Sequence, residues 1–199
     1  MRVVELRGNP QLYCCNIYFV LGDSNARDDV NTLVDVGTDG AVLQGVLSCA
    51  TGIGKARVGQ VVITHDHFDH AAGLADVVAA YSPVVRAFSA LGGTARPVAD
   101  GEWLRLGDRD CKVLHTPGHS SDSICVYCPP ERALFSGDLP VRIQTPGGSY
   151  PRELAGSLER LVALRIDVVY TGHGGAMRGN VREMLEQTLR NVQASGVDP

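Results

Sequence analysis

The sequence predicts a mixed α/β fold in which two β-sheets pack together and helices cover them on the outside. Short β-branched and apolar runs dominate the first third of the chain, and helical patterns with small or amphipathic faces follow in the middle and near the C-terminus. Turns rich in Gly and Pro separate these runs. The length of 199 residues and the hydrophobic content of 44% are ordinary for a globular chain, so we expect residues 1–199 to form a single domain.

The elements are expected in a definite order. Strands over 16–21 and 32–36 form a hairpin with a long polar tip, and a short helix follows over 41–50. The continuous apolar run 60–64 predicts a strand that is buried on both faces. Small apolar residues at helical spacing predict one helix over 69–81, which ends before a proline. The remaining expected elements are strands at 83–89, 103–107, 111–115, 123–127, 133–135 and 167–170, and helices at 152–164 and 181–194.

Composition argues against several classes of protein. The chain has 18 Lys+Arg and 22 Asp+Glu, a formal net charge of −4, which argues against a general nucleic-acid binder. No apolar run approaches the length of about 20 residues that a membrane span needs, and no secretory signal pattern is present. We therefore expect a cytoplasmic protein with six reduced cysteines and no nucleic-acid or membrane partner. The sequence leaves the oligomeric state open.

A dense cluster of His and Asp follows the apolar run that predicts a buried strand. Three His and two Asp lie within six residues, at His65, Asp66, His67, Asp69 and His70. The C-terminal end of such a strand is where binding sites in α/β sheets lie. Imidazole and carboxylate are ligands that zinc, iron and manganese accept, and in an extended loop the spacing of His65 and His67 lets both rings point to one side. The cluster therefore predicts a metal site.

Three single residues extend this constellation. His119, Asp138 and His173 each follow an apolar run and a directly preceding glycine. A glycine next to a ligand lets the backbone come close without a Cβ clash. We interpret all three residues as further candidate ligands.

The order HxHxDH, then His, then Asp, then His resembles the metallo-β-lactamase-fold superfamily. Within it, the chain is most similar to short glyoxalase-II-like (hydroxyacylglutathione hydrolase-like) metallohydrolases. The segment Val34-Asp35-Val36-Gly37 is similar to the early Asp-x-Gly segment of the family. The resemblance implies a four-layer αββα sandwich with a metal site at one edge of the two sheets.

The resemblance also implies a set of roles for these residues. Two divalent metal ions are implied, with Zn2+ expected and Fe or Mn as alternatives. The implied ligands are His65, His67 and His119 for the first ion, Asp69, His70 and His173 for the second, and Asp138 for both. Asp69 and Asp138 are the implied catalytic carboxylates. Asp35 and Asp66 are candidates for orienting the imidazole rings through hydrogen bonds.

Such a centre makes a hydrolase the leading hypothesis. A metal-bridging hydroxide would attack a thioester or ester of a small molecule. A thioester fits best because no general acid is evident and a thiol leaving group needs little protonation. The loop after Asp138 offers Arg142, Tyr150 and Arg152 as candidate substrate contacts, since an Arg can clamp a carboxylate.

Two alternatives remain open at this stage. One is an oxidoreductase that resembles the mononuclear-iron persulfide dioxygenases, in which His65, His119 and Asp138 match the iron ligands. The other is a lactonase, although such enzymes carry a Tyr shortly after the bridging Asp. Here the first Tyr after Asp138 is Tyr150.

Overall fold

Two six-stranded β-sheets form the centre of the structure, a computed structural model that describes residues 1–197. In the first sheet the order is β1 (Arg2–Leu6), β2 (Ile17–Leu21), β3 (Thr32–Val34), β4 (Gln60–Val62), β5 (Val84–Ala87) and β6 (Arg96–Pro97). In the second sheet the order is β13 (Met177–Arg178), β12 (Val168–Thr171), β10 (Ala133–Gly137), β9 (Ile124–Cys128), β8 (Arg109–His115) and β7 (Trp103–Leu106). A short parallel pair joins β11 (Ser149–Tyr150) to β14 (Gly196–Val197).

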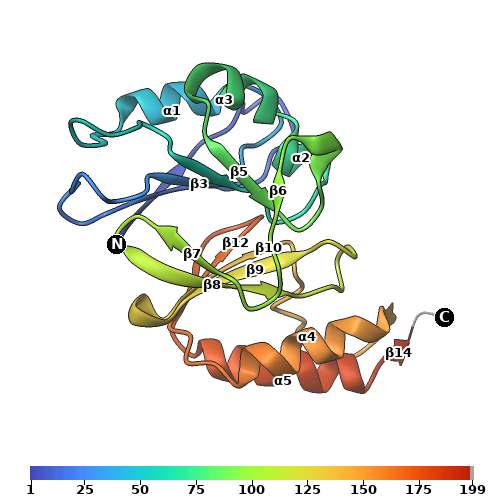
Figure 1. The fold of residues 1–199 in the computed structure, drawn as a ribbon. Coiled ribbons are helices and arrows are strands. Elements are labelled where there is room, and N and C mark those ends of the chain that lie inside the picture. The colour runs from blue at the N-terminus through green and yellow to red at the C-terminus, as the bar shows by residue number, and fades with distance from the viewer. Residues whose placement is uncertain (198–199) are drawn as a thin grey trace.

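Helices cover the outer face of each sheet (Figure 1). The first sheet carries α1 (Val42–Ser48), α2 (Phe68–Ala71) and α3 (Leu74–Tyr81). The second sheet carries α4 (Arg152–Val162) and α5 (Val181–Gln193), which run side by side in Figure 1. The sequence of layers is therefore helix, sheet, sheet, helix, and the predicted αββα sandwich is confirmed.

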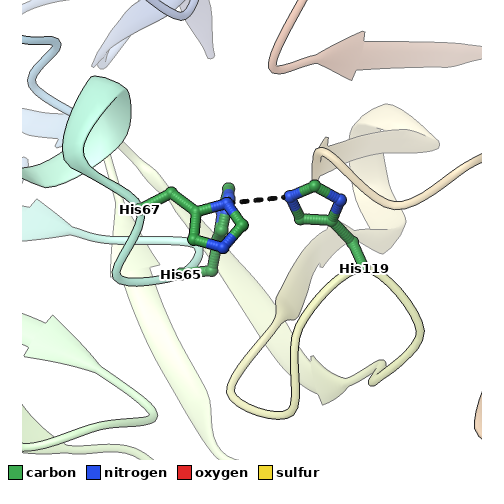
Figure 2. Close-up of side chains that lie close together, drawn as sticks. All are labelled: His65, His67 and His119. Atoms are coloured by element: carbon green, nitrogen blue, oxygen red, sulfur yellow. Dashed lines mark hydrogen bonds between the residues drawn. The ribbon is translucent and has the colours of Figure 1, made fainter.

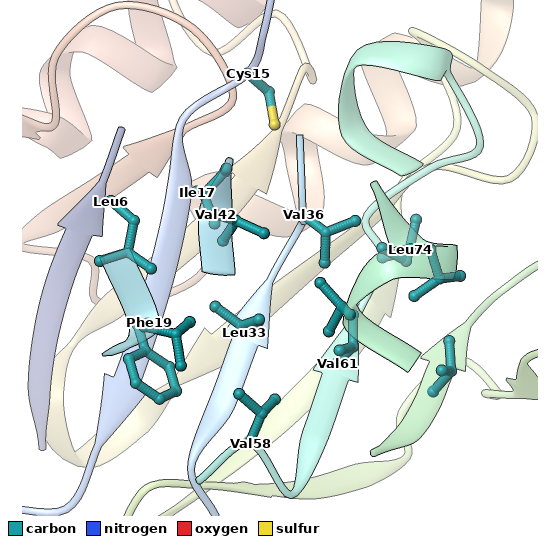
Figure 3. Packing of buried hydrophobic residues seen from close by; sticks show 14 of the residues in the cluster. Leu6, Cys15, Ile17, Phe19, Leu33, Val36, Val42, Val58, Val61 and Leu74 are labelled. Atoms are coloured by element: carbon teal, nitrogen blue, oxygen red, sulfur yellow. The ribbon is translucent and has the colours of Figure 1, made fainter. Parts of the chain in front are cut away.

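Three hydrophobic clusters fill the spaces between the layers. Figure 3 shows the first cluster, in which Phe19 and Leu33 of the first sheet pack against Val42 of α1 and Leu74 of α3. The second cluster lies between the two sheets and includes Phe135. The third cluster lies under α4 and α5, where apolar residues at helical spacing, such as Leu154, Leu158 and Leu161, are fully buried.

Strand directions and registers bring several strand ends to one edge of the sandwich. β3 and β4 are parallel with Val34 opposite Val62, so these two strands end at the same level. β10 and β12 are also parallel, with Gly137 opposite Thr171 after a register shift. The carboxyl ends of parallel strands meet at one edge of a sheet. The loops that follow these four strands are therefore neighbours.

Some elements differ from the sequence predictions. The helix expected over 69–81 is interrupted, and α2 and α3 are separate helices. A Cβ at Gly73 would lie 2.5 Å from the carbonyl oxygen of Asp39, so the chain passes too close for a side chain at this bend. The strand expected over 32–36 ends at Val34, because Asp35 has a left-handed φ of +58°. β1 and the two-residue strands β6, β11, β13 and β14 were not expected.

Two short 3-10 helices complete the described elements, η1 (Leu91–Gly93) and η2 (Pro129–Glu131). Within residues 1–197, no helix is both long enough and apolar enough to cross a bilayer.

Candidate metal centre

Seven His and Asp side chains converge at the edge where the four strands end. They are His65 and His67 after β4, Asp69 and His70 in α2, His119 between β8 and β9, Asp138 after β10, and His173 after β12. The buried strands β4, β10 and β12 fix where these loops begin. The short helix α2 then turns Asp69 and His70 into the buried interior, where both side chains are nearly inaccessible.

The first group consists of His65, His67 and His119, whose rings converge in Figure 2. His67 Nδ1 lies 3.1 Å from His65 Nε2 and 3.0 Å from His119 Nε2. His65 is buried, whereas His67 and His119 are exposed to solvent. One nitrogen from each ring thus faces a common point that solvent can reach.

The second group consists of Asp69, His70, Asp138 and His173, whose ligand-type atoms all lie within 4.8 Å of one another. Asp69 Oδ2 lies 3.0 Å from His173 Nε2 and 3.6 Å from His70 Nε2. Asp138 Oδ1 lies 3.3 Å from His70 Nε2.

Asp138 lies between the two groups. Its Oδ2 atom is 3.6 Å from His119 Nε2 and 4.0 Å from His65 Nε2, both in the first group. The same oxygen is 3.4 Å from His173 Nε2 in the second group. Because one carboxylate is close to both groups, its position is the one from which two neighbouring ions can be contacted.

The donor atoms fit bound metal ions. His70 Nε2 and Asp138 Oδ1 are buried and have no hydrogen-bond partner within the described residues. Such orphaned atoms are costly unless another partner, such as an ion, satisfies them. Nitrogen ligands 2.0–2.1 Å from one tetrahedral zinc ion lie roughly 3.3 Å apart, close to the separations in the first group. At Gly172 a Cβ would lie 2.0 Å from Asp138 Oδ1, so only glycine leaves room for this carboxylate.

Asp35 orients the ring of His70 from beneath the site. The Asp35 carboxylate accepts hydrogen bonds from the Thr64 amide at 2.8 Å, from Thr64 Oγ1 at 2.9 Å and from His70 Nδ1 at 2.8 Å. With Nδ1 carrying the proton, His70 Nε2 is directed to the site. Thr64 Oγ1 donates its proton to Asp35, so it acts as the acceptor for His65 Nδ1 at 3.1 Å. This hydrogen bond directs His65 Nε2 to the site in the same way.

Asp66, which was predicted to orient an imidazole ring, lies away from the rings. The side chain is exposed, and its backbone N–H donates to Asp122 Oδ2 at 3.0 Å. Within residues 1–197 its carboxylate makes no hydrogen bond to an imidazole ring. Of the two predicted orienting carboxylates, Asp35 contacts an imidazole ring and Asp66 does not.

The pKa shifts of the site residues follow from burial and charge. Burial lowers the pKa of His65 to about 4 and also lowers the pKa of His119, so both rings are neutral at pH 7. Burial also acts to lower the pKa of His70, but Asp35 and Asp138 outweigh it and raise the value to about 10. Burial acts to raise the pKa of Asp138, yet the nearby His70 ring holds that pKa below its ordinary value.

A third buried group, Cys15 with Asp35 and His70, is less suited to a metal ion. Its hydrogen bond with Cys14, together with burial, raises the pKa of the Cys15 thiol. A metal ligand must be the thiolate, so Cys15 is a poor ligand at neutral pH. The Asp35 oxygens are also already engaged by Thr64 and His70.

The three predicted substrate contacts have different surroundings. Arg142 lines an open hollow of about 820 Å³ that also has His173 in its wall. Arg142 makes no hydrogen bond or ion pair within the described residues. Tyr150 and Arg152 do not line this hollow. Tyr150 packs half-buried against the cluster under α4 and α5, and Arg152 is exposed at the start of α4.

Tyr13 is a site residue that sequence reasoning missed. Its hydroxyl lies 3.3 Å from His173 Nε2, and its ring stacks on the His173 ring with centroids 4.9 Å apart. The only signal in the sequence is an aromatic residue in the loop before the strand predicted at 16–21. Neither spacing nor a motif connects that loop with His173.

Comparison with known proteins identifies the family. The family model of the Metallo-beta-lactamase superfamily matches residues 14–173, which is most of the chain. This match contains all seven converging His and Asp residues. The chain belongs to the Metallo-beta-lactamase superfamily.

Two curated relatives and one solved structure are similar over most of this chain. An Atrochrysone carboxyl ACP thioesterase of Aspergillus fumigatus is 28% identical, over 96% of this chain and 62% of the relative. A Hydroxyacylglutathione hydrolase of Hydrogenovibrio crunogenus is 31% identical, over 79% of this chain and 59% of the relative. The chain thus spans about three fifths of the length of these relatives. The crystal structure of TTHA1623 in a di-iron-bound form has a TM-score of 0.68 and 25% identity, over 96% of this chain and 98% of that one.

Proposed function

We propose that the chain is a metal-dependent hydrolase that uses two divalent ions to cleave a thioester or ester of a small molecule. The observation that carries the proposal is the position of Asp138, whose carboxylate lies within 4.0 Å of ligand atoms from both groups of the centre. Two groups of donors that share one carboxylate match the ligand pattern of a dinuclear site.

The proposed roles follow this grouping. His65, His67 and His119 would hold one ion, Asp69, His70 and His173 would hold the other, and Asp138 would contact both. We expect Zn2+, because imidazole and carboxylate donors in this geometry suit it. The related protein TTHA1623 was solved with two irons, which supports two metal positions in this fold and keeps iron as the alternative.

Two bound ions would supply a Lewis acid for the scissile carbonyl and an activated water at neutral pH. The protein contributes fixed geometry and charge. Asp35 holds the Nδ1 proton of His70 and thereby keeps Nε2 free. Asp138 stays ionised because its pKa is lowered, and Asp69 is fixed by its 3.0 Å contact with His173 Nε2. Asp69 and Asp138 are therefore the carboxylates to which we assign the catalytic role.

The relatives support a thioester as the substrate. One is named a thioesterase and the other a hydrolase of hydroxyacylglutathione. The open hollow beside His173 has room for the thiol carrier, and Arg142 and Arg178 in its wall can bind an anionic group of that carrier. An oxygen ester needs a protonated leaving group, for which the centre offers no evident acid.

The proposal is tested by comparing reaction classes on metal-loaded protein. We would measure hydrolysis of a thioester, an oxygen ester and a lactone, and oxygen consumption with a persulfide. Thioester hydrolysis should be fastest and should fall at least a hundredfold in Asp138→Asn. Asp76→Asn, an exposed carboxylate change on α3, should leave the rate unchanged. Oxygen consumption without thioester hydrolysis would replace the hydrolase by an iron-dependent oxidoreductase.

A further inference from the structure

Two exposed aromatic side chains flank the candidate metal centre. The side chains of Tyr13 and Phe68 are 66% and 61% exposed. Their ring centroids are 6.4 Å apart, within the range of an interacting aromatic pair. Tyr13 stacks on His173 at 4.9 Å, and Phe68 lies between His67 and Asp69 in the chain. An aromatic surface thus continues directly from the proposed metal ligands into solvent.

Hydrogen bonds hold this surface in place. The carbonyl oxygen of Tyr13 accepts from Thr38 Oγ1. Two residues further along, the Cys15 amide donates to the carbonyl oxygen of Asp69 at 3.3 Å, and the Asn16 amide donates to that of Gly172 at 2.6 Å. The segment that carries Tyr13 is therefore tied to α2, which carries Asp69, and to the loop that carries His173. Phe68 is fixed because it begins α2.

The two sides of the centre differ in chemistry. The hollow on the α5 side of His173 has both apolar and polar walls, and Arg142, Arg178, Asn180 and Glu183 bring charged and polar groups to it. The Tyr13 side presents aromatic ring surface. Aromatic rings bind apolar and aromatic groups through burial and stacking, whereas a charged hollow suits a polar carrier. A thioester joins these two kinds of group, an acyl chain and a thiol carrier, at the bond that is cleaved.

We propose that Tyr13 and Phe68 form the acyl-binding surface of this enzyme and select thioesters with an aromatic or bulky apolar acyl group. The inference rests on the proposed hydrolase function and adds the class of acyl group to it. Tyr13 and Phe68 are specificity-determining residues through their rings. The Tyr13 hydroxyl, which contacts His173 Nε2, is separable from the ring by substitution with Phe.

The test compares acyl groups on one neutral thiol. Acetyl, hexanoyl and benzoyl thioesters of N-acetylcysteamine would be assayed with the wild type, Tyr13→Ala, Phe68→Ala and Tyr13→Phe. Trp103→Ala is the matched control, because Trp103 is a 56% exposed aromatic residue whose ring neighbour is Lys112 on β8. The alanine variants should each raise KM for the benzoyl thioester about tenfold more than they raise KM for the acetyl thioester. Tyr13→Phe and Trp103→Ala should keep the wild-type preference.

A binding measurement gives a readout that does not depend on turnover. Isothermal titration calorimetry with benzoate and acetate should show tighter binding of benzoate, and this difference should be lost in Tyr13→Ala and Phe68→Ala. If both alanine variants raise KM for the acetyl and benzoyl thioesters equally, or raise neither KM, the acyl-binding surface is refuted while thioester hydrolysis stands. If no thioester is cleaved by metal-loaded wild type, the hydrolase proposal fails, and the benzoate titration still decides whether the aromatic surface binds acyl groups.

Discussion

Replacing Asp35 by Asn tests how the buried layer beneath the metal centre stabilises the protein. Asn keeps the shape of the side chain and tolerates the left-handed φ of +58° at this position. It removes the negative charge that faces His70, however. The Asn side chain also has an NH2 group in place of one carboxylate oxygen. At least one of the buried donors on Thr64 and His70 therefore loses its acceptor.

The magnitude follows from the His70 pair. In the metal-free protein the pKa of His70 is raised from 6.5 to about 10. At pH 7 the folded pKa lies about three units above the pH, which corresponds to roughly 4 kcal/mol of stabilisation of the folded state. Asp138 shares in the effect, so we expect Asp35→Asn to lower the free energy of unfolding by about 2–4 kcal/mol. Breaking a buried ion pair costs about 3–5 kcal/mol in general, which agrees with this range.

The effect has a defined pH dependence. A histidine whose folded pKa is raised stabilises the folded state fully below its unfolded pKa of 6.5 and loses that contribution as pH rises through about 10. The stability difference between wild type and Asp35→Asn should therefore shrink between pH 7 and pH 10. The loss of the orienting hydrogen bond should also weaken zinc binding by about 10–100-fold.

The assay is urea unfolding of chelator-treated protein at pH 7 and pH 10, followed by zinc competition titration at pH 7. Asp66→Asn is the control, because the Asp66 side chain is exposed on the loop after β4. It should change the free energy of unfolding by less than about 0.5 kcal/mol. A free energy of unfolding for Asp35→Asn within about 0.5 kcal/mol of wild type at pH 7 would refute the reasoning.

Three other predictions concern space, packing and metal removal. Gly172→Ala should weaken metal binding at least tenfold in a competition titration, because the new Cβ would lie 2.0 Å from Asp138 Oδ1. Gly175→Ala is the control, because open space surrounds Gly175, and it should leave the metal affinity unchanged. Equal metal affinities of the two variants would contradict the close approach at Gly172. Leu158→Ala should cost about 2–5 kcal/mol of unfolding free energy in denaturant titration with unchanged metal affinity, because this α4 side chain is fully buried in the cluster beneath the helix. A loss below about 1 kcal/mol would contradict this. Metal at 100 times its Kd should add about 2.7 kcal/mol of stability in thermal melts, and an unchanged Tm after chelation would show that the centre binds no ion in the folded state.

The constellation of candidate ligands could be predicted because it depends on local order in the chain. The apolar run at Gln60–Val62 is β4, and the cluster that begins at His65 follows it as expected. Asp138 and His173 likewise follow buried strands, β10 and β12. In each case the strand is visible as an apolar run, and its end fixes where the polar residue lies.

Features that depend on tertiary contact could not be predicted in this way. The periodicity of the helix expected over 69–81 continues across Gly73, and tertiary contacts interrupt it. The Gly73 amide donates to the carbonyl oxygen of Gly37, and the Asp39 carbonyl oxygen lies where a side chain at Gly73 would be. The contact of Tyr13 with His173 joins two loops that no motif connects. Asp35 and Asp66 were equivalent candidates in sequence, and burial separates them, since only Asp35 lies beneath the rings.

The central claim is that the seven residues hold two ions at once. Elemental analysis of protein purified without added metal, followed by titration with zinc, tests this claim most directly. We predict about two ions per chain in the wild type, with Asp138→Asn reducing the number. About one iron per chain with no second ion taken up, or no metal bound in excess zinc, would contradict the dinuclear centre.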